Sequence, residues 1–257
     1  MKKGEKLWTR EELILTINLY SKLTFGRLHQ RNPDVIHLAK LIGRTSGAVA
    51  YKLVNFASID PVQKARGIKG ASNASKLDEV IWHEYFHHTD EVPYESEKLL
   101  AKLEHTTVEK LFDIPENELP KEGKMRERIV KVRVNQALFR SFILASYDNT
   151  CCITGIKQPE FLIAGHIKPW SIDEKNRLNY QNGIAINALH DKAFENGLLT
   201  ITPDFKIKIS SILKKQSKDT VIQEYFLRYD NKPMIMPYRS LPNVEFLKYH
   251  NHERFKH

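Results

Sequence analysis

A histidine and two carboxylates in the second half of the chain have types and spacings that could carry chemistry. The apolar run 161–164 is typical of a buried strand, and His166 follows it at the expected strand end. A second apolar run, 183–186, precedes a helical segment that carries Asp191 and Glu195. Side chains four residues apart lie on one face of a helix, where two carboxylates can hold a hard divalent cation. The order strand, loop, strand and helix therefore predicts a candidate metal site.

Short motifs surround these residues in a fixed order. The chain contains Cys-Cys-Ile-Thr-Gly at 151–155, His-Ile-Lys-Pro-Trp at 166–170 and the run NGIAINALHDKAFENGLL at 182–199. In this order and at these spacings, the motifs resemble the HNH (His-Asn-His) endonuclease family, in its restriction-endonuclease-like branch. The catalytic unit of that family is a ββα-metal motif. The resemblance covers roughly the C-terminal half of the chain and extends more loosely to the tail at 241–255.

The resemblance implies a role for each matching residue. His166 matches a general base that removes a proton from the attacking water, and imidazole suits that role because its pKa lies near working pH. Asn182 matches the asparagine that ties the loop to the strands and so orients the histidine. Asp191 matches a metal-coordinating position, with Glu195 as a second candidate ligand one turn later. His190 is ambiguous, since it could ligate the metal or hydrogen-bond phosphate.

Two departures from the family pattern concern metal ions. Many relatives carry an acidic or histidine ligand just before the first histidine, whereas this chain has Gly165, which offers no side-chain donor. We therefore expect a single weakly held divalent ion, Mg²⁺ or Mn²⁺. Many relatives also bind a structural zinc ion through two cysteine pairs. Here only Cys151 and Cys152 are present, and Asn187 stands where such a cysteine often lies, so no structural zinc is expected.

The charge of the chain indicates a polyanionic partner. The 257 residues carry a formal net charge of +9, which favours nucleic acid because phosphate neutralisation releases counterions. Much of this charge falls on one predicted amphipathic helix that leads into the motifs. We expect the partner to be double-stranded DNA. The predicted nucleic-acid contacts are Lys124, Arg126, Arg128, Lys131, Arg133, Arg140 and Lys168.

The first hundred residues are predicted to be mainly helical. Thr9 before an acidic first turn is typical of a helix start, and residues 35–56 form two helical patterns separated at 43–46. This arrangement resembles a helix-turn-helix whose second helix could enter a DNA groove. Two amphipathic helices packed in a small bundle have the same pattern, so both interpretations stay open. A loop is predicted at 68–73.

Composition divides the chain into two parts. Residues 111–123 are acidic, contain two prolines and lack a periodic apolar face, which favours a linker. We therefore predict a helical domain at 1–110, which could read DNA, and a nuclease domain at 124–257. The predicted class is α+β, with a ββα-metal unit and flanking helices in the second domain.

Membrane and secretory classes are not indicated by the sequence. No run approaches the roughly 18 apolar residues of a membrane span, and no apolar region follows the first lysines as in a secretory signal. The two adjacent cysteines are poorly placed to form a disulfide with each other. We therefore expect a cytoplasmic protein with reduced thiols and no membrane partner.

Together, these observations predict a metal-dependent DNA endonuclease that acts in restriction or phage defence. Two alternatives stay open. One is a non-catalytic DNA-binding regulator with a degenerate nuclease fold, which Gly165 favours. The other is an effector nuclease that a small ligand activates. A homodimer would match a palindromic target and would cut both strands with one site in each protomer, but the sequence does not determine the oligomeric state.

Overall fold

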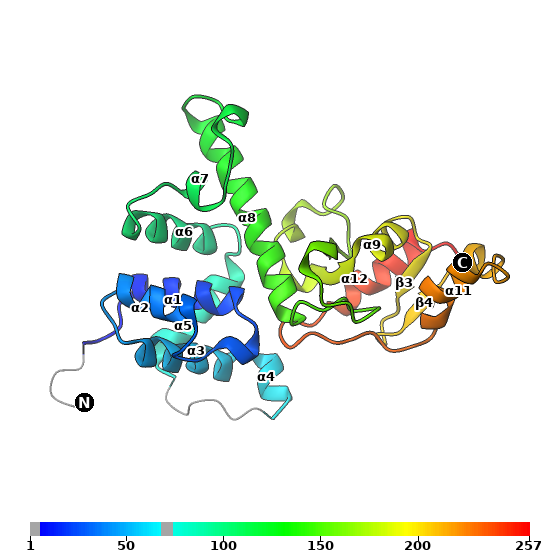
Figure 1. The fold of residues 1–257 in the computed structure, drawn as a ribbon, viewed down its shortest axis with the longest axis horizontal. Coiled ribbons are helices and arrows are strands. Elements are labelled where there is room, and N and C mark those ends of the chain that lie inside the picture. Colours follow the sequence, from blue (N-terminus) through cyan, green and yellow to red (C-terminus); the bar gives the residue numbers. More distant parts are fainter. Residues whose placement is uncertain (1–5, 68–73) are drawn as a thin grey trace. The chain divides into compact units, whose positions relative to one another are not determined.

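The computed structural model describes residues 6–67 and 74–257, so the loop predicted at 68–73 lies outside the described residues. Contacts divide the chain into two compact units, Met1–Ser141 and Phe142–His257. Unit 1 is helical, and unit 2 combines short helices with two small antiparallel sheets (Figure 1). The predicted α+β class is confirmed.

Unit 1 is a helical bundle built around α1 (Arg10–Lys22), which packs against α3, α5 and α6 (Figure 1). A capping box starts α1: the Thr9 side chain accepts from the Glu12 N–H, and the Glu12 carboxylate accepts from the Thr9 N–H. The other helices of this unit are α2 (Pro33–Leu41), α3 (Ser46–Ile59), α4 (Pro61–Ala65), α5 (Lys76–His87), α6 (Val92–Leu103) and α7 (Val108–Leu111). The long helix α8 (Lys124–Ser146) begins in unit 1 and ends in unit 2.

Helices α2 and α3 are joined by a short turn, as a helix-turn-helix requires. Gly43 adopts a positive φ of 64° in this turn, and the Thr45 side chain caps α3 by accepting from the Ala48 N–H. Helix α3 is nevertheless enclosed by α1, α2, α4 and α5. Along the whole of α3, which the structure describes completely, only Tyr51 is exposed. DNA reading by this element stays a prediction, and it could involve only a small part of the helix surface.

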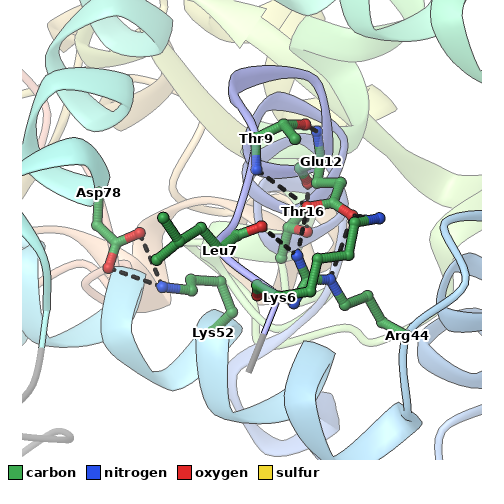
Figure 2. Close-up of polar contacts among 8 residues, drawn as sticks. All are labelled: Lys6, Leu7, Thr9, Glu12, Thr16, Arg44, Lys52 and Asp78. Atoms are coloured by element: carbon green, nitrogen blue, oxygen red, sulfur yellow. Dashed lines mark hydrogen bonds and ion pairs between the residues drawn. The ribbon is translucent and has the colours of Figure 1, made fainter. Parts of the chain in front are cut away.

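The arginine in that turn is engaged within unit 1 (Figure 2). The Arg44 guanidinium forms a salt bridge of 2.7 Å with Glu12 and donates to the carbonyls of Lys6 and Leu7. Burial alone would raise the pKa of Glu12, but hydrogen bonds from Arg44, Thr9 and Lys6 outweigh burial and lower that pKa to about 2. Arg44 therefore fastens the turn to the start of α1 and is not directed at a partner.

A buried ion pair joins α3 to α5. The Lys52 ammonium lies 2.9 Å from the Asp78 carboxylate, and both side chains are buried (Figure 2). Asp78 also accepts from the Ser75 N–H and thereby completes the capping box of α5. Because two charges have been taken out of water here, each depends on the other for compensation.

The segment predicted as a linker is packed against α8. Ile114 and Leu119 are buried in one apolar cluster with Val130, Val134 and Leu138 of α8. The apolar residues of this segment have no helical or strand period, so its composition predicts a linker; they are Leu111, Phe112, Ile114 and Leu119. The division of the chain by contacts falls at Ser141–Phe142, and the domain boundary predicted at 111–123 stays a prediction.

The basic residues of α8 are partly neutralised within unit 1. Three of the six predicted DNA contacts on this helix form salt bridges: Arg126 with Glu109 and Glu116, Lys131 with Glu91, and Arg133 with Glu118. Lys124 and Arg128 are exposed. The charge run therefore serves in part to hold α8 against the acidic segments before it.

Unit 2 contains the strands and helix expected from the motifs. Strand β1 (Leu162–His166) pairs antiparallel with β2 (Gly183–Asn187), with His166 opposite Gly183. Helix α9 (Ala188–Glu195) follows β2 directly and contacts both strands. The end of α8 supports this unit, because the Phe142 ring stacks on Tyr180 at a centroid distance of 3.8 Å.

The remainder of unit 2 follows α9 along the chain. Strand β3 (Leu199–Ile201) pairs antiparallel with β4 (Ile207–Ile209). Three short helices follow, α10 (Ser211–Lys214), α11 (Thr220–Tyr225) and α12 (Val244–Tyr249), and the last continues as a π-helical turn at His250–Arg254. No helix in the described parts of the chain is both long and apolar enough to cross a membrane.

The Lys52–Asp78 pair leads to a stability prediction. Lys52→Met leaves the Asp78 carboxylate buried without its partner, which is expected to lower the free energy of unfolding by about 3–5 kcal/mol. Lys40→Met removes the same charge from an exposed position of α2 and serves as the control, with an expected change below about 0.5 kcal/mol. Urea unfolding followed by circular dichroism measures both variants. Equal unfolding midpoints for the two variants would contradict this account of the pair.

Candidate active site

Strand β1 and helix α9 bring a histidine and two carboxylates to one cavity. The cavity has a volume of about 790 Å³, and His166, Asp191 and Glu195 all line it. His166 is the last residue of β1, whereas Asp191 and Glu195 lie one turn apart on α9. The spacing predicted that the carboxylates share a helix face, and the structure turns that face toward the histidine.

The hydrogen bonding of His166 determines which nitrogen carries the proton. Its Nε2 lies 2.8 Å from the Arg177 carbonyl oxygen, which can only accept, so Nε2–H donates. In the neutral ring the lone pair therefore resides on Nδ1. Burial lowers the pKa of His166 below its ordinary value of 6.5, although the bond to Arg177 opposes that shift. The ring is consequently neutral, and able to accept a proton, at pH 7.

Asn182 holds together the two segments that position His166. Its side chain is fully buried, and its Oδ1 accepts from the Lys168 N–H at 2.8 Å. Its Nδ2 donates to the Lys168 carbonyl and to the Asn176 carbonyl, at 3.0 and 3.2 Å. One amide thus joins the turn after β1 to the loop that presents the Arg177 carbonyl. This geometry supports a positioning role for Asn182.

Gly165 leaves the space that the Asp191 carboxylate occupies. A Cβ atom added at Gly165 would lie 2.5 Å from Asp191 Oδ1 and 3.1 Å from Ile186 Cγ2. The first distance is too short for a real Cβ contact, so a larger residue would require the carboxylate to move. Gly165, which departs from the family pattern, therefore makes room for the Asp191 carboxylate of α9, which packs directly over it.

The Asp191 carboxylate is held in an unfavourable place for a charge. It is half-buried, and within the described residues it receives no hydrogen bond or salt bridge. Burial, and then repulsion from Glu195, raise its pKa from 3.8 to about 6, while attraction to Lys192 opposes this rise. Lys192 itself pairs with Glu195 at 3.1 Å. A carboxylate with these surroundings is a suitable ligand for a cation.

The structure places His190 away from the cavity, in contrast to its predicted catalytic role. Only 1% of the residue is exposed; Nε2 donates to the Tyr225 carbonyl, and Nδ1 lies 2.9 Å from Asn187 Oδ1. Burial lowers the pKa of His190, and the bond to Tyr225 opposes this shift. Successive residues of a helix point about 100° apart, so when Asp191 faces the cavity His190 faces the core. His190 is a packing residue in this geometry.

A cluster of neutral polar groups fixes the start of α9. The Asn187 side chain caps the helix by accepting from the His190 N–H, and its Nδ2 donates to Cys151 Sγ and Thr154 Oγ1 at 3.4 and 3.2 Å. The Asn187 backbone N–H also donates to Cys151 Sγ. Hydrogen bonds therefore join the 151–154 turn to the β2–α9 junction, at the position where relatives often carry zinc-binding cysteines.

The cations of the cavity differ from those predicted. Lys168 forms a salt bridge of 2.9 Å with Asp173 and does not line the cavity. The cavity is lined instead by Arg177, Lys192 and Arg254. Sequence reasoning missed Arg177 because it lies in a polar loop without a periodic pattern. Arg254 lies in the tail of the loose resemblance, and no local signal marked it as part of the site.

The carboxylate ligands in the cavity suit an ion such as Mg²⁺, which keeps several water ligands, better than a metal that is coordinated by protein side chains alone. Within the described ranges, no group of three or more histidine, cysteine, aspartate or glutamate side chains could hold a metal ion together. Asp191 and Glu195 offer two carboxylates on the cavity wall. Mg²⁺ commonly binds one or two carboxylates and keeps several waters, so this sparse donor set fits such an ion.

Comparison with protein families assigns the segment that carries this geometry. A family model described as HNH endonuclease matches residues 151–202, which contain β1, β2, α9 and β3. The resemblance predicted from the sequence is thereby confirmed for this segment, and an HNH domain indicates nuclease activity on nucleic acids. No curated protein matches the chain.

The raised pKa of Asp191 predicts a gain of stability when its charge is removed. Because the folded value of about 6 exceeds the ordinary 3.8, the stabilisation by proton binding is complete below pH 3.8 and lost as pH rises through 6. Asp191→Asn is therefore expected to raise the free energy of unfolding at pH 7.5 by about 1 kcal/mol, discounted for partial exposure. The gain should shrink at pH 4.

Thermal unfolding at pH 7.5 and pH 4 measures this effect. Asp204→Asn is the matched control, because Asp204 is exposed and hydrogen bonding to Lys206 lowers its pKa. The control should leave the midpoint at pH 7.5 unchanged or slightly lower. An Asp191→Asn variant that is less stable than the native protein at pH 7.5 would contradict the inferred desolvation.

Proposed function

We propose, from the premise of an HNH domain in residues 151–202, that the protein is a metal-dependent endonuclease that hydrolyses phosphodiester bonds in DNA. The observation that carries this proposal is the cavity shared by His166, Asp191 and Glu195. Hydrolysis of a phosphodiester requires a base for the attacking water and positive charge near the phosphate. The histidine suits the first requirement, and the carboxylate pair suits the second because it can hold a cation.

In the proposed reaction, His166 Nδ1 accepts a proton from the attacking water. The water oxygen forms a bond to phosphorus, and the bond from phosphorus to the 3′ oxygen breaks. The Arg177 carbonyl supports this assignment because its bond to Nε2–H leaves the lone pair on Nδ1. Asn182 acts as a positioning residue, since it ties both segments around the ring. General base catalysis of this kind contributes about 10²–10⁴-fold to a rate.

Asp191 and Glu195 would hold the divalent ion, which we propose to be Mg²⁺ or Mn²⁺. When bound, such an ion stabilises the negative charge that develops on the scissile phosphate and on the leaving oxygen. The half-buried position and raised pKa of Asp191 support this assignment, because a cation would compensate its charge. The predicted absence of structural zinc stays a prediction.

Gly165 gives less support to a non-catalytic regulator than the sequence suggested. A missing ligand before His166 favoured a degenerate site. The Cβ position of Gly165 coincides with the space of the Asp191 carboxylate, so the absence of a side chain there is compatible with a working arrangement.

We further propose that the protein cuts double-stranded DNA in the cytoplasm, in a restriction or phage-defence setting. The union of a small nuclease unit with a separate helical unit supports this setting, because unit 1 could then select the target. A homodimer would supply one site for each strand. The salt bridges of α8 leave Lys124 and Arg128 as the more accessible DNA contacts of that helix.

A ligand-activated effector nuclease is the second candidate function. It is favoured by a cavity of about 340 Å³ in unit 1, lined by leucines of α1 and α2 and by Lys22, Arg27 and His37. A cavity of this size suits a small molecule that combines an apolar part with a polar edge. Cleavage that appears only after addition of a nucleotide would favour this candidate over constitutive cleavage.

Plasmid cleavage tests the proposed function directly. Purified protein is incubated with unmodified and modified plasmid DNA in the presence of Mg²⁺, Mn²⁺ or EDTA. We expect nicking or linearisation with either metal and none with EDTA. His166→Ala should lower the rate by about 10²–10⁴-fold, because it removes the base but no proposed metal ligand.

His252→Ala provides the matched control for that experiment. His252 is an exposed histidine of the same unit and does not line the cavity, so this variant should cleave at the native rate. Cleavage by His166→Ala at the native rate would contradict the assignment of the base. Absence of cleavage by the native protein on every substrate, with and without nucleotide, would contradict both candidate functions.

The pH dependence of cleavage follows from two groups in the cavity. Asp191 binds a cation only when ionised, and its pKa is raised to about 6; the pKa of His166 is lowered below 6.5. The rate should therefore rise with pH through roughly pH 6 and level off above it. Saturating metal should move the acid limb to lower pH, because the metal favours the ionised carboxylate. A rate that falls between pH 5 and pH 7 would contradict both assignments.

A further inference from the structure

Arg254 is the cavity cation that carries no carboxylate partner. Of the three lysines and arginines that line the cavity, Arg177 pairs with Glu174 and Lys192 pairs with Glu195. Arg254 forms no salt bridge with any residue that the structure describes. Its Nη2 donates instead to the carbonyl oxygen of Glu195, at 2.6 Å. A neutral acceptor leaves the positive charge of the guanidinium uncompensated.

The C-terminal segment delivers Arg254 to the cavity through a close backbone contact with Gly197. Gly197 has a positive φ of 69°, and a Cβ atom there would collide with the carbonyl oxygen of Arg254. Two residues later, the Lys256 N–H donates to the Gly197 carbonyl at 2.9 Å. The tail is thereby fastened to the chain just after the end of α9.

Buried polar contacts hold the preceding turn equally firmly. The His250 ring stacks on Phe194 at a centroid distance of 3.6 Å, and its Nε2 donates to the Phe194 carbonyl. Its Nδ1 accepts from the Thr200 hydroxyl at 2.8 Å. Asn251 donates to the Ile201 carbonyl at 2.8 Å. These contacts join the turn at His250–Arg254 to both α9 and β3, so Arg254 is supported by a fixed backbone.

We infer that Arg254 binds a phosphate group of the nucleic-acid backbone at the edge of the catalytic cavity. A guanidinium has five N–H donors in a planar fork that matches two oxygens of a phosphate, and only one donor is used by Glu195. The inference rests on the proposed function, since a phosphodiester must approach His166 and Asp191 to react. It adds a residue outside the segment 151–202 that the family model matches.

Binding of a short duplex in EDTA tests this inference apart from cleavage. Fluorescence anisotropy is measured with a labelled DNA duplex over a range of salt concentrations. Arg254→Gln is expected to weaken binding about tenfold, because a hydrogen-bonded charged contact is lost. The slope of log affinity against log salt should fall in magnitude by about 0.9, the value for one phosphate contact.

Two further variants separate phosphate binding from folding and from general charge. Arg228→Gln removes the same charge from an exposed residue that pairs with Glu224, and it should leave both affinity and slope nearly unchanged. Arg254→Lys keeps the charge and loses the fork, so the slope should persist while kcat/KM falls. Thermal unfolding of each variant shows whether it folds. If Arg254→Gln does not fold, the affinity and salt slope of Arg254→Lys test the phosphate site instead.

The outcomes distinguish this inference from the proposed function. Equal affinities and equal slopes for Arg254→Gln and Arg228→Gln would overturn the phosphate site, even if the native protein cleaves DNA. A native protein that binds no duplex would overturn it as well. Conversely, a loss of affinity and slope confined to Arg254→Gln supports the site even if no cleavage is found with any metal, in which case only the proposed function fails.

Discussion

The close approach of α9 to β1 at Gly165 is the constraint on which the candidate site depends. The Asp191 carboxylate fills the space that any side chain at Gly165 would need. A side chain before His166 would require this carboxylate to move, so the proposed cation ligands are the two carboxylates of α9. The close approach also removes the Asp191 carboxylate from water, which raises its pKa. The same packing thus places an unfavourably desolvated charge in the cavity that His166 also lines, and functional sites commonly retain such local instability.

Two asparagines keep that approach in register from opposite ends of β2. Asn182, just before the strand, ties the loops around His166, and Asn187, its last residue, caps α9 and reaches Cys151 and Thr154. Buried amide bonds are effective here because the surrounding dielectric is low and their donors and acceptors are largely satisfied. Hydrogen bonds therefore fasten the 151–154 turn to the helix, at the position where the resemblance implies zinc-binding cysteines in many HNH proteins.

The features predicted from sequence were those with local causes. Apolar runs located β1 and β2, and helix spacing aligned Asp191 with Glu195. The features missed depend on distant partners. His190 is buried because the Tyr225 carbonyl lies above it, and Ile114 packs because α8 is present. The local sequence pattern around a residue does not show which distant residue will pack against it, because the fold determines that partner.

The net charge of the chain indicates a class of partner, but it does not show which surface binds that partner. The basic run of α8 was the most conspicuous signal, yet Arg126, Lys131 and Arg133 are paired with acidic residues of their own unit. If a phosphate replaced those carboxylates, the gain in binding free energy would be only the difference between the new ion pair and the one it displaces. A cation opposed by a neutral carbonyl, as Arg254 is, offers its full charge. Because contacts at Gly197 bring that cation from the tail, the lining of the cavity extends beyond the residues 151–202 that match the family model.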